Sequence, residues 1–275
     1  MFERLQQGVQ VIDASLDVFR ARPRLAVLPL LSLLTVGSAY TAIGVALLHY
    51  ELVGAIITNN VVQYGVVFVA FGISSGLGIF FNAAVVHCAR QYFEGAEPSV
   101  RGGLAAAWAA RRSIAKWGLV SATVGTVLYI AEDAVPGVGT LTRSVLDMAW
   151  GLLTFFVIPV IVIERNPTLR SDLRSSGTAF KRTWGESVTA SLGIGLALLP
   201  AGLVGLGLLA VAYVSAGGIV AYALGALGGL VLVGTLVTSH VLGMVARTAL
   251  YHYATEGEHV GPVAELDPDG VFAES

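Results

Sequence analysis

One uninterrupted stretch constrains the fold of this chain more than any other feature. Residues 187–246 are sixty consecutive positions without a single Asp, Glu, Lys or Arg. A helix rises by about 1.5 Å per residue, so this stretch is long enough to cross a hydrocarbon layer of roughly 30 Å twice. Residues 215–218, Ser-Ala-Gly-Gly, offer the turn between the two crossings. The stretch therefore predicts a hairpin of two transmembrane helices.

A polar, arginine-rich segment precedes this hairpin and has helical periodicity. Within residues 167–185, four large apolar residues are spaced by 4, 7 and 4 positions: Leu169, Leu173, Phe180 and Trp184. Residues at these offsets share one helical face. The segment predicts an amphipathic helix that lies along the membrane interface, with its charged face toward water.

The same order of helix and hairpin recurs in the rest of the chain. An amphipathic helix is predicted at 2–20 before spans at 25–50 and 61–89, and another at 101–116 before spans at 119–131 and 145–163. The string Lys116-Trp117-Gly118 resembles Arg182-Thr183-Trp184-Gly185. We therefore predict an all-α polytopic membrane protein with six transmembrane helices, arranged as three repeats of interfacial amphipathic helix plus transmembrane hairpin. The repeats cover about 1–95, 98–165 and 167–257 of a single membrane domain, and 258–275 form a short, acidic, disordered tail.

The two middle spans are short. Their uncharged runs, 117–131 and 148–163, contain 15 and 16 residues, whereas a span usually needs about 20. The third span can begin inside 113–116 if Lys116 extends its ammonium group to the interface. The fourth can begin near Arg143 if Asp147 is paired.

The distribution of basic residues predicts the orientation. Fifteen of the 16 Lys and Arg residues fall at the termini or between hairpins, and only Arg143 falls on the other side. The positive-inside rule then predicts a multi-pass protein of the cell membrane with cytoplasmic N- and C-termini. Because these cations adjoin spans and alternate with apolar residues, we expect anionic lipid headgroups on the cytoplasmic side as their partner, and no nucleic acid.

Polar residues at membrane depth are the candidate site residues. An outer charge cluster of Glu132, Asp133, Arg143 and Asp147 is either an entrance for an ion or solute or a set of ion pairs that makes a short span tolerable. Three intramembrane polar groups, Asn82, His87 and His240, either line a site or hydrogen-bond between helices.

Small residues and prolines predict how the spans pack and bend. Ladders of small residues at every fourth position allow close helix contact: Gly72 and Gly76; Gly193, Ala197, Ala201 and Gly205; Gly217, Ala221, Gly225 and Gly229. Pro159 and Pro200 each remove a helical hydrogen bond, so we expect kinks in the fourth and fifth spans.

No motif in the sequence predicts an enzyme. The five histidines include no pair at i and i+4, and Cys88 is the one cysteine, so the spacing predicts no metal site and no cofactor. We name no catalytic residue.

Several strings resemble a known group of proteins. Residues 80–84 (FFNAA), 148–150 (MAW) and 183–186 (TWGE) are similar to prokaryotic six-helix integral membrane proteins of a family of unknown function, a resemblance that covers about 1–257. The plan of amphipathic helix plus hairpin more loosely resembles the membrane domain attached to glycerophosphodiester phosphodiesterases, without that catalytic domain. The first resemblance implies the fold and leaves the activity open.

Two functions remain as hypotheses at this point. The low polar content of the spans favours a non-enzymatic membrane interaction or scaffold protein, with a second copy or another membrane protein as a further partner. The repeats, the prolines and the outer charge cluster favour the alternative, a transporter or channel for a small solute or lipid.

Overall fold

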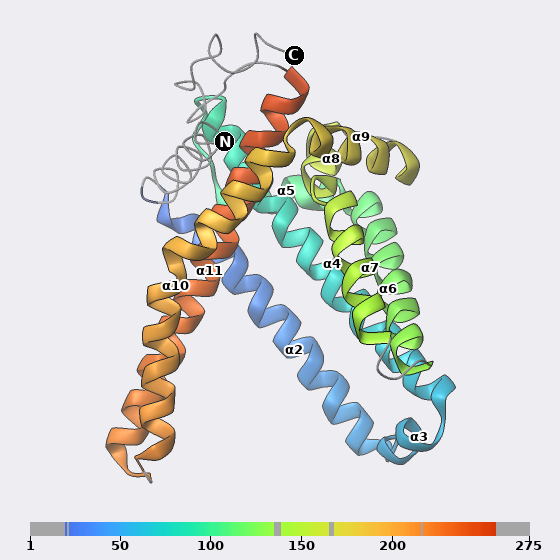
Figure 1. Ribbon diagram of the computed structural model, residues 1–275, viewed down its shortest axis with the longest axis vertical. Coiled ribbons are helices and arrows are strands. Elements are labelled where there is room, and N and C mark those ends of the chain that lie inside the picture. Colours follow the sequence, from blue (N-terminus) through green and yellow to red (C-terminus); the bar gives the residue numbers. More distant parts are fainter. Residues whose placement is uncertain (1–19, 21, 135–138, 165–167, 216, 257–275) are drawn as a thin grey trace. The chain divides into compact units, whose positions relative to one another are not determined.

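The computed structural model describes residues 20, 22–134, 139–164, 168–215 and 217–256. Of these described residues, 90% are helical and none is in a strand, which confirms the all-α prediction. Figure 1 shows the elements in chain order: η1 (Pro23–Ala26), α2 (Val27–His49), α3 (Val53–Thr58), α4 (Asn60–Phe93), α5 (Val100–Ala109), α6 (Arg111–Ala134), α7 (Gly139–Leu153), α8 (Val157–Ile163), α9 (Leu169–Arg182), α10 (Trp184–Val214) and α11 (Ile219–Glu256).

Within the described residues, six helical segments are long and apolar enough to span a membrane, as predicted. They are Pro23–His49, Asn60–Phe93, Arg111–Glu132, Ser144–Ile163, Ser187–Val214 and Ile219–Thr255. The third span reaches 22 residues because its helix already begins at Arg111, and the fourth reaches 20. Both middle spans therefore have the length that the uncharged runs alone lacked.

The described chain divides into two compact units. Unit 1 contains η1, residues 92–96 and the pair α10 and α11, whereas unit 2 contains residues 27–91 and 97–182, with α2 to α9. The predicted helix at 2–20 and the tail at 258–275 lie outside the described residues, except for Arg20.

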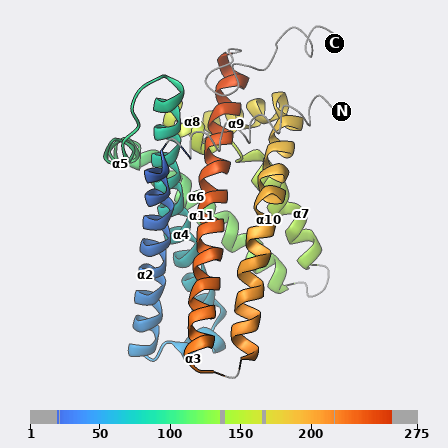
Figure 2. The same ribbon diagram turned by 90° about the vertical axis from the view of Figure 1, so that its left-hand side faces the viewer.

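Unit 1 is dominated by the α10–α11 hairpin, whose two helices run side by side in Figures 1 and 2. The two helices approach closely at Gly205 and Gly228, where a Cβ on Gly228 would lie 2.9 Å from the Gly205 carbonyl oxygen. Of the predicted ladder in α10, only Gly205 lies at this contact, because Ala197 and Ala201 are exposed. In α11 the tightest of these contacts uses Gly228. Of the predicted ladder, a Cβ on Gly225 would lie 3.7 Å from the Ala212 Cβ atom of α10, whereas Gly229 faces open space.

In unit 2, glycines let α6 pack closely on α4. A Cβ on Gly118 would lie 3.1 Å from the Gly76 Cα atom, and one on Gly72 would lie 3.6 Å from the Ala122 Cβ atom. Gly72 and Gly76 thus both lie at this helix contact, as predicted, but the tight fit depends on Gly118, because a Cβ on Gly76 would meet nothing within 4 Å. The short helix α5 also contacts α4, because a Cβ on Gly103 would meet the Ala84 carbonyl oxygen at 2.8 Å.

The fourth span is broken between α7 and α8, at residues 154–156. Pro159 lies in the first turn of α8, where its missing N–H is tolerated, and it cannot bond the carbonyl of residue 155. The predicted bend at Pro159 therefore takes the form of a helix break. In contrast, α10 continues through Pro200.

Two boundaries differ from the sequence prediction. The break before the third span falls at Ala110, not after Lys116, so Lys116-Trp117-Gly118 lies inside α6. The similar string near residue 183 instead spans a break, because α9 ends at Arg182 and α10 begins at Trp184. The two strings therefore occupy different structural positions, and the threefold repeat stays a prediction.

Candidate functional site

The predicted outer charge cluster lies at one end of the α6–α7 hairpin. Glu132 is near the end of α6 and half-buried, while Asp147 is in α7 and exposed. The side chains of Asp133 and Arg143 lie outside the described residues. The pairing of Arg143 with a carboxylate therefore stays a prediction.

The three predicted intramembrane polar groups are divided between the units. Asn82 and His87 lie on α4 in unit 2, five positions apart and therefore on different helical faces. His240 lies on α11 in unit 1 and is exposed. Within one unit, these residues do not converge on a common point. The described residues include no group of three or more His, Cys, Asp or Glu side chains that could hold a metal ion.

A polar site that the sequence did not indicate lies where α9 packs against α6. The indole N–H of Trp117 donates a hydrogen bond to the Asp172 carboxyl oxygen Oδ2, at 2.7 Å. Trp117 is 1% exposed and Asp172 is 3% exposed. A buried hydrogen bond of this kind fixes α9 to α6, because either partner alone would leave a polar group without water.

The hydroxyl of Ser176, one turn after Asp172, closes the break between α7 and α8. It accepts a hydrogen bond from the Phe156 backbone N–H at 3.1 Å and donates one to the Leu153 carbonyl at 2.7 Å. Both backbone groups lie at helix ends, where a helix leaves donors and acceptors without an internal partner. One side chain of α9 therefore satisfies both sides of the break.

Aromatic rings surround these hydrogen bonds. Phe180 of α9 packs on Phe155 and Phe156, with ring centroids 5.5 and 6.5 Å apart. Trp117 packs on Trp150 of α7, with centroids 6.4 Å apart. Rings at these separations exclude water and favour tilted or edge contacts. We call the set Trp117, Trp150, Phe155, Phe156, Asp172, Ser176 and Phe180 the α9 clamp.

The α9 clamp uses polar residues of this helix that the sequence prediction did not single out, beside Phe180 of the predicted apolar stripe. The buried residues of α9 are Asp172, Ser176, Ala179 and Phe180. Leu169 and Leu173 are half-buried, and Trp184 is exposed as the first residue of α10. The buried face of α9 contacts α6, α7 and α8, so protein packing accounts for much of its amphipathic pattern. Asp172 is the lone acid among four bases in 167–185, a signal that could have pointed to it.

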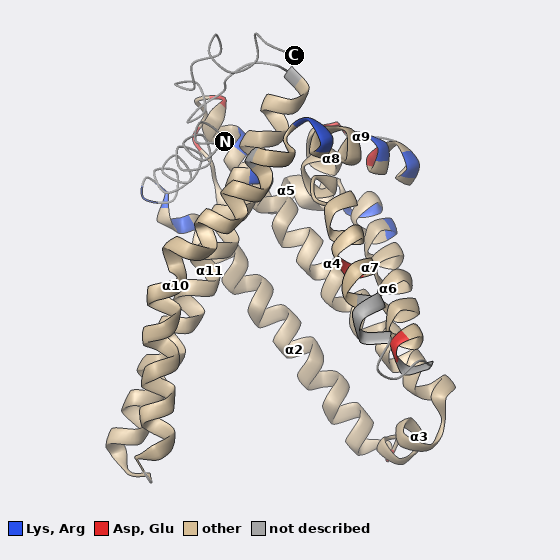
Figure 3. Cartoon of the chain, in the orientation of Figure 1, with Lys and Arg blue, Asp and Glu red and all other residues tan. Residues whose placement is uncertain are grey.

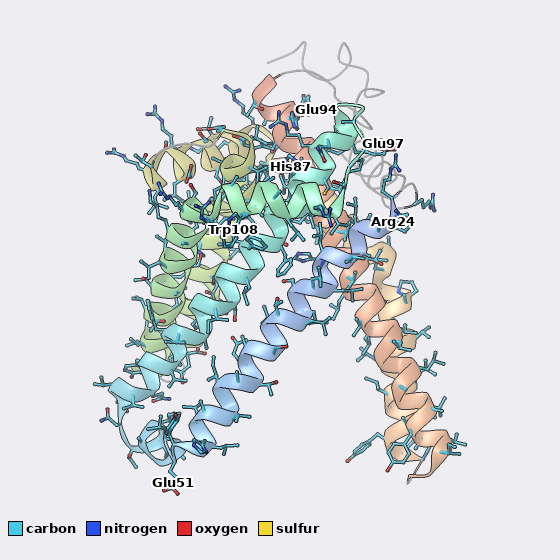
Figure 4. The ribbon with its side chains drawn as sticks, turned by 180° about the vertical axis from the view of Figure 1, so that it is seen from behind. Arg24, Glu51, His87, Glu94, Glu97 and Trp108 are labelled. Carbon is cyan, nitrogen blue, oxygen red and sulfur yellow. The ribbon has the colours of Figure 1, made fainter. Side chains whose placement is uncertain are left out.

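Exposed cations gather at the end of unit 2 where α9 lies, as the blue segments of α6 and α9 show in Figure 3. The exposed cations of α6 and α9 are Arg111, Arg112, Lys116, Arg170, Arg174, Lys181 and Arg182, and α5 carries the exposed Arg101. The Arg111 guanidinium stacks over the exposed Trp108 ring, 5.4 Å from its centroid. Trp108 and His87 lie toward the opposite end of unit 2 from Glu51 (Figure 4). Unit 2 is therefore polarised: exposed basic residues lie at one end, and the helical spans that extend from this end are apolar.

These features define a multi-pass α-helical membrane protein. Residues 61–261 match a family described as Family of unknown function (DUF6159), and the chain belongs to this family. No curated protein and no solved structure matches the chain. The looser resemblance to the membrane domain of glycerophosphodiester phosphodiesterases stays a prediction.

Proposed function

We propose that this protein is a non-enzymatic membrane interaction or scaffold protein, with both termini in the cytoplasm and anionic lipid headgroups at its basic end. One observation carries the proposal: the spans expose large apolar side chains along their length, while exposed cations gather at one end of unit 2. A surface of this kind is matched to lipid, and headgroups with negative charge complement its basic end.

The α10–α11 hairpin supports a membrane-facing role. Its exposed apolar residues include Leu196, Leu203, Val211, Leu230 and Leu236. At its tip, Tyr213 and Tyr222 are 90% and 78% exposed, and tyrosines are typical of the membrane–water interface. From Tyr222 to Arg247 the helix rises by about 37 Å, which is slightly more than a hydrocarbon layer of roughly 30 Å. The tip and Arg247 are therefore spaced to reach opposite interfaces.

A transporter or channel is the second candidate, and the broken fourth span is the observation that favours it. Discontinuous helices form substrate sites in transporters when their free backbone groups face a cavity. At this break, however, Ser176 takes up the Phe156 N–H and the Leu153 carbonyl. Phe156 is also fully buried. This packing favours a structural role for the break, and hence the scaffold.

The proposal extends to the organisation of the chain and to its protein partners. The threefold repeat is supported by two pairs of short helix and spanning helix, α5 with α6 and α9 with α10. A second copy of the chain or another membrane protein is a further proposed partner, bound through the exposed apolar faces of the spans.

Reconstitution into proteoliposomes separates the two functions. We expect vesicles that contain the protein to hold protons and small ions as well as protein-free vesicles do. We also expect fluorescent lipids to move between leaflets no faster than in protein-free vesicles. The comparison variant is Ser176→Ala, which removes the two hydrogen bonds across the break without changing a charge. A saturable flux that depends on the wild-type protein would contradict the scaffold and support the transporter.

A further inference from the structure

The exposed face of α6 joins cations to an apolar stripe. Five exposed residues follow one another at spacings of 4, 3, 4 and 4: Arg112, Lys116, Leu119, Thr123 and Val127. Positions at these spacings lie on one helical face. Leu119 and Val127 are 59% and 58% exposed. The face therefore begins with two positive charges and continues as a surface suited to hydrocarbon.

The one polar residue within the stripe does not interrupt it. The Thr123 hydroxyl donates a hydrogen bond to the Leu119 carbonyl at 2.9 Å, within the same helix. A hydroxyl that is already satisfied presents its methyl group and needs no water. The opposite face of α6 is occupied by protein, because Gly118, Ala122 and Gly125 meet α4.

The cations of this face have no acidic neighbour in their own segment. The chain contains no Asp or Glu between Glu97 and Glu132. The hydrogen bond from Trp117 to Asp172 instead holds α9 beside the same turns of α6. The exposed cations of α9 lie on this neighbouring helix, and Figure 3 shows Lys and Arg segments on both α6 and α9 at this end of unit 2. This end of unit 2 is therefore complementary to an anion.

The length of the stripe points to one leaflet of a bilayer. From Lys116 to Val127 the helix rises by about 16 Å, and half of a hydrocarbon layer is roughly 15 Å. If Arg112 and Lys116 hold the phosphate of a lipid, the exposed apolar surface that follows them along the helix is about as long as an acyl chain. A soluble anion would use the charges and leave this surface unused.

We propose that the exposed face of α6 is a binding site for a phospholipid with a net negative headgroup. Arg112 and Lys116 hold its phosphate, and one acyl chain lies along Leu119, Thr123 and Val127. This site rests on the proposed membrane role and deepens it, since it names the lipid class and the residues that select it.

Native mass spectrometry of the full chain, released from nanodiscs with equal phosphatidylglycerol and phosphatidylcholine, tests the site. The double variant Arg112→Gln/Lys116→Gln is compared with Arg174→Gln/Lys181→Gln. The control removes two exposed cations from α9, whose exposed face has no large apolar side chain beneath them. Each lost cation should weaken the preference for the anionic lipid about fivefold. We therefore expect Arg112→Gln/Lys116→Gln to lower the ratio of retained phosphatidylglycerol to phosphatidylcholine roughly 25-fold. We expect less than about fivefold for the control, because its charges act only at a distance.

Two further measurements keep the result unambiguous. Circular dichroism shows that each variant is folded, and Arg112→Lys, which keeps the charge, retains the lipid. We also expect inorganic phosphate, at concentrations up to about 50 mM, not to displace the lipid from the wild-type protein. Phosphate groups at a bilayer surface are far more concentrated than this. Equal losses in both double variants, no loss in either, or displacement by phosphate would each overturn the site. Solute flux in proteoliposomes would contradict the scaffold and leave this lipid ratio unchanged.

Discussion

Ser176→Ala tests whether the break in the fourth span depends on α9. The substitution removes one oxygen atom and, with it, the hydrogen bonds to the Phe156 N–H and the Leu153 carbonyl. Ser176 is fully buried, so water does not replace these bonds. An unsatisfied buried donor or acceptor costs about 1–3 kcal/mol. Because two backbone groups are affected, we expect a loss of about 2–6 kcal/mol in the free energy of unfolding.

The neighbouring serine is a matched control. Ser175 has the same side chain on the same helix, but its hydroxyl donates to the exposed Glu164 carboxylate at 2.8 Å. Ser175→Ala should therefore cost less than about 1 kcal/mol. Equilibrium unfolding by titration of a mild detergent with dodecyl sulfate, followed by circular dichroism, measures both variants. Equal losses for Ser175→Ala and Ser176→Ala would refute the role of Ser176 at the break.

Three other substitutions test separate contacts by the same unfolding assay. Trp117→Phe removes the indole donor to Asp172 and should cost about 2 kcal/mol or more, whereas a loss no larger than that of Leu119→Ala would contradict a clamp at this point. Gly228→Ala places a Cβ 2.9 Å from the Gly205 carbonyl and should cost about 1–3 kcal/mol. Its control, Gly229→Ala, places a Cβ in open space and should cost nothing. Equal effects of the two substitutions would argue against this hairpin contact. If Arg143 pairs with Asp147, Arg143→Ala should destabilise the chain and the double variant with Asp147→Ala should recover much of the loss, so strictly additive losses would exclude the pair.

The spans were predictable because the bilayer imposes length and polarity on each one separately. Uncharged runs located all six, and Pro159 indicated the break in the fourth because a missing N–H acts locally. The short third span was expected to begin before Lys116, and its helix does begin five residues earlier, at Arg111.

Contacts between helices were not predictable, because one sequence does not say which partner faces a given residue. Apolar spacing indicated that Leu169, Leu173, Phe180 and Trp184 form one face of a helix at the membrane interface. It gave no sign that Asp172 and Ser176 are buried against other helices. Those polar residues are buried because Trp117 and a broken helix elsewhere in the chain supply their partners. Gly228 was missed in favour of Gly229 for the same reason, since spacing alone does not locate the facing helix.

Cysteine accessibility in intact cells tests the membrane embedding and orientation of this chain most directly. Single cysteines are placed on a Cys88→Ser background at Thr58, Ala105, Thr178 and Ser215, all of which are exposed. The positive-inside rule predicts that a membrane-impermeant maleimide labels positions 58 and 215 from outside. Positions 105 and 178, beside the basic residues of α5 and α9, should react only after permeabilisation. The reverse pattern would contradict the orientation, and labelling of all four positions in intact cells would contradict the six-span topology itself.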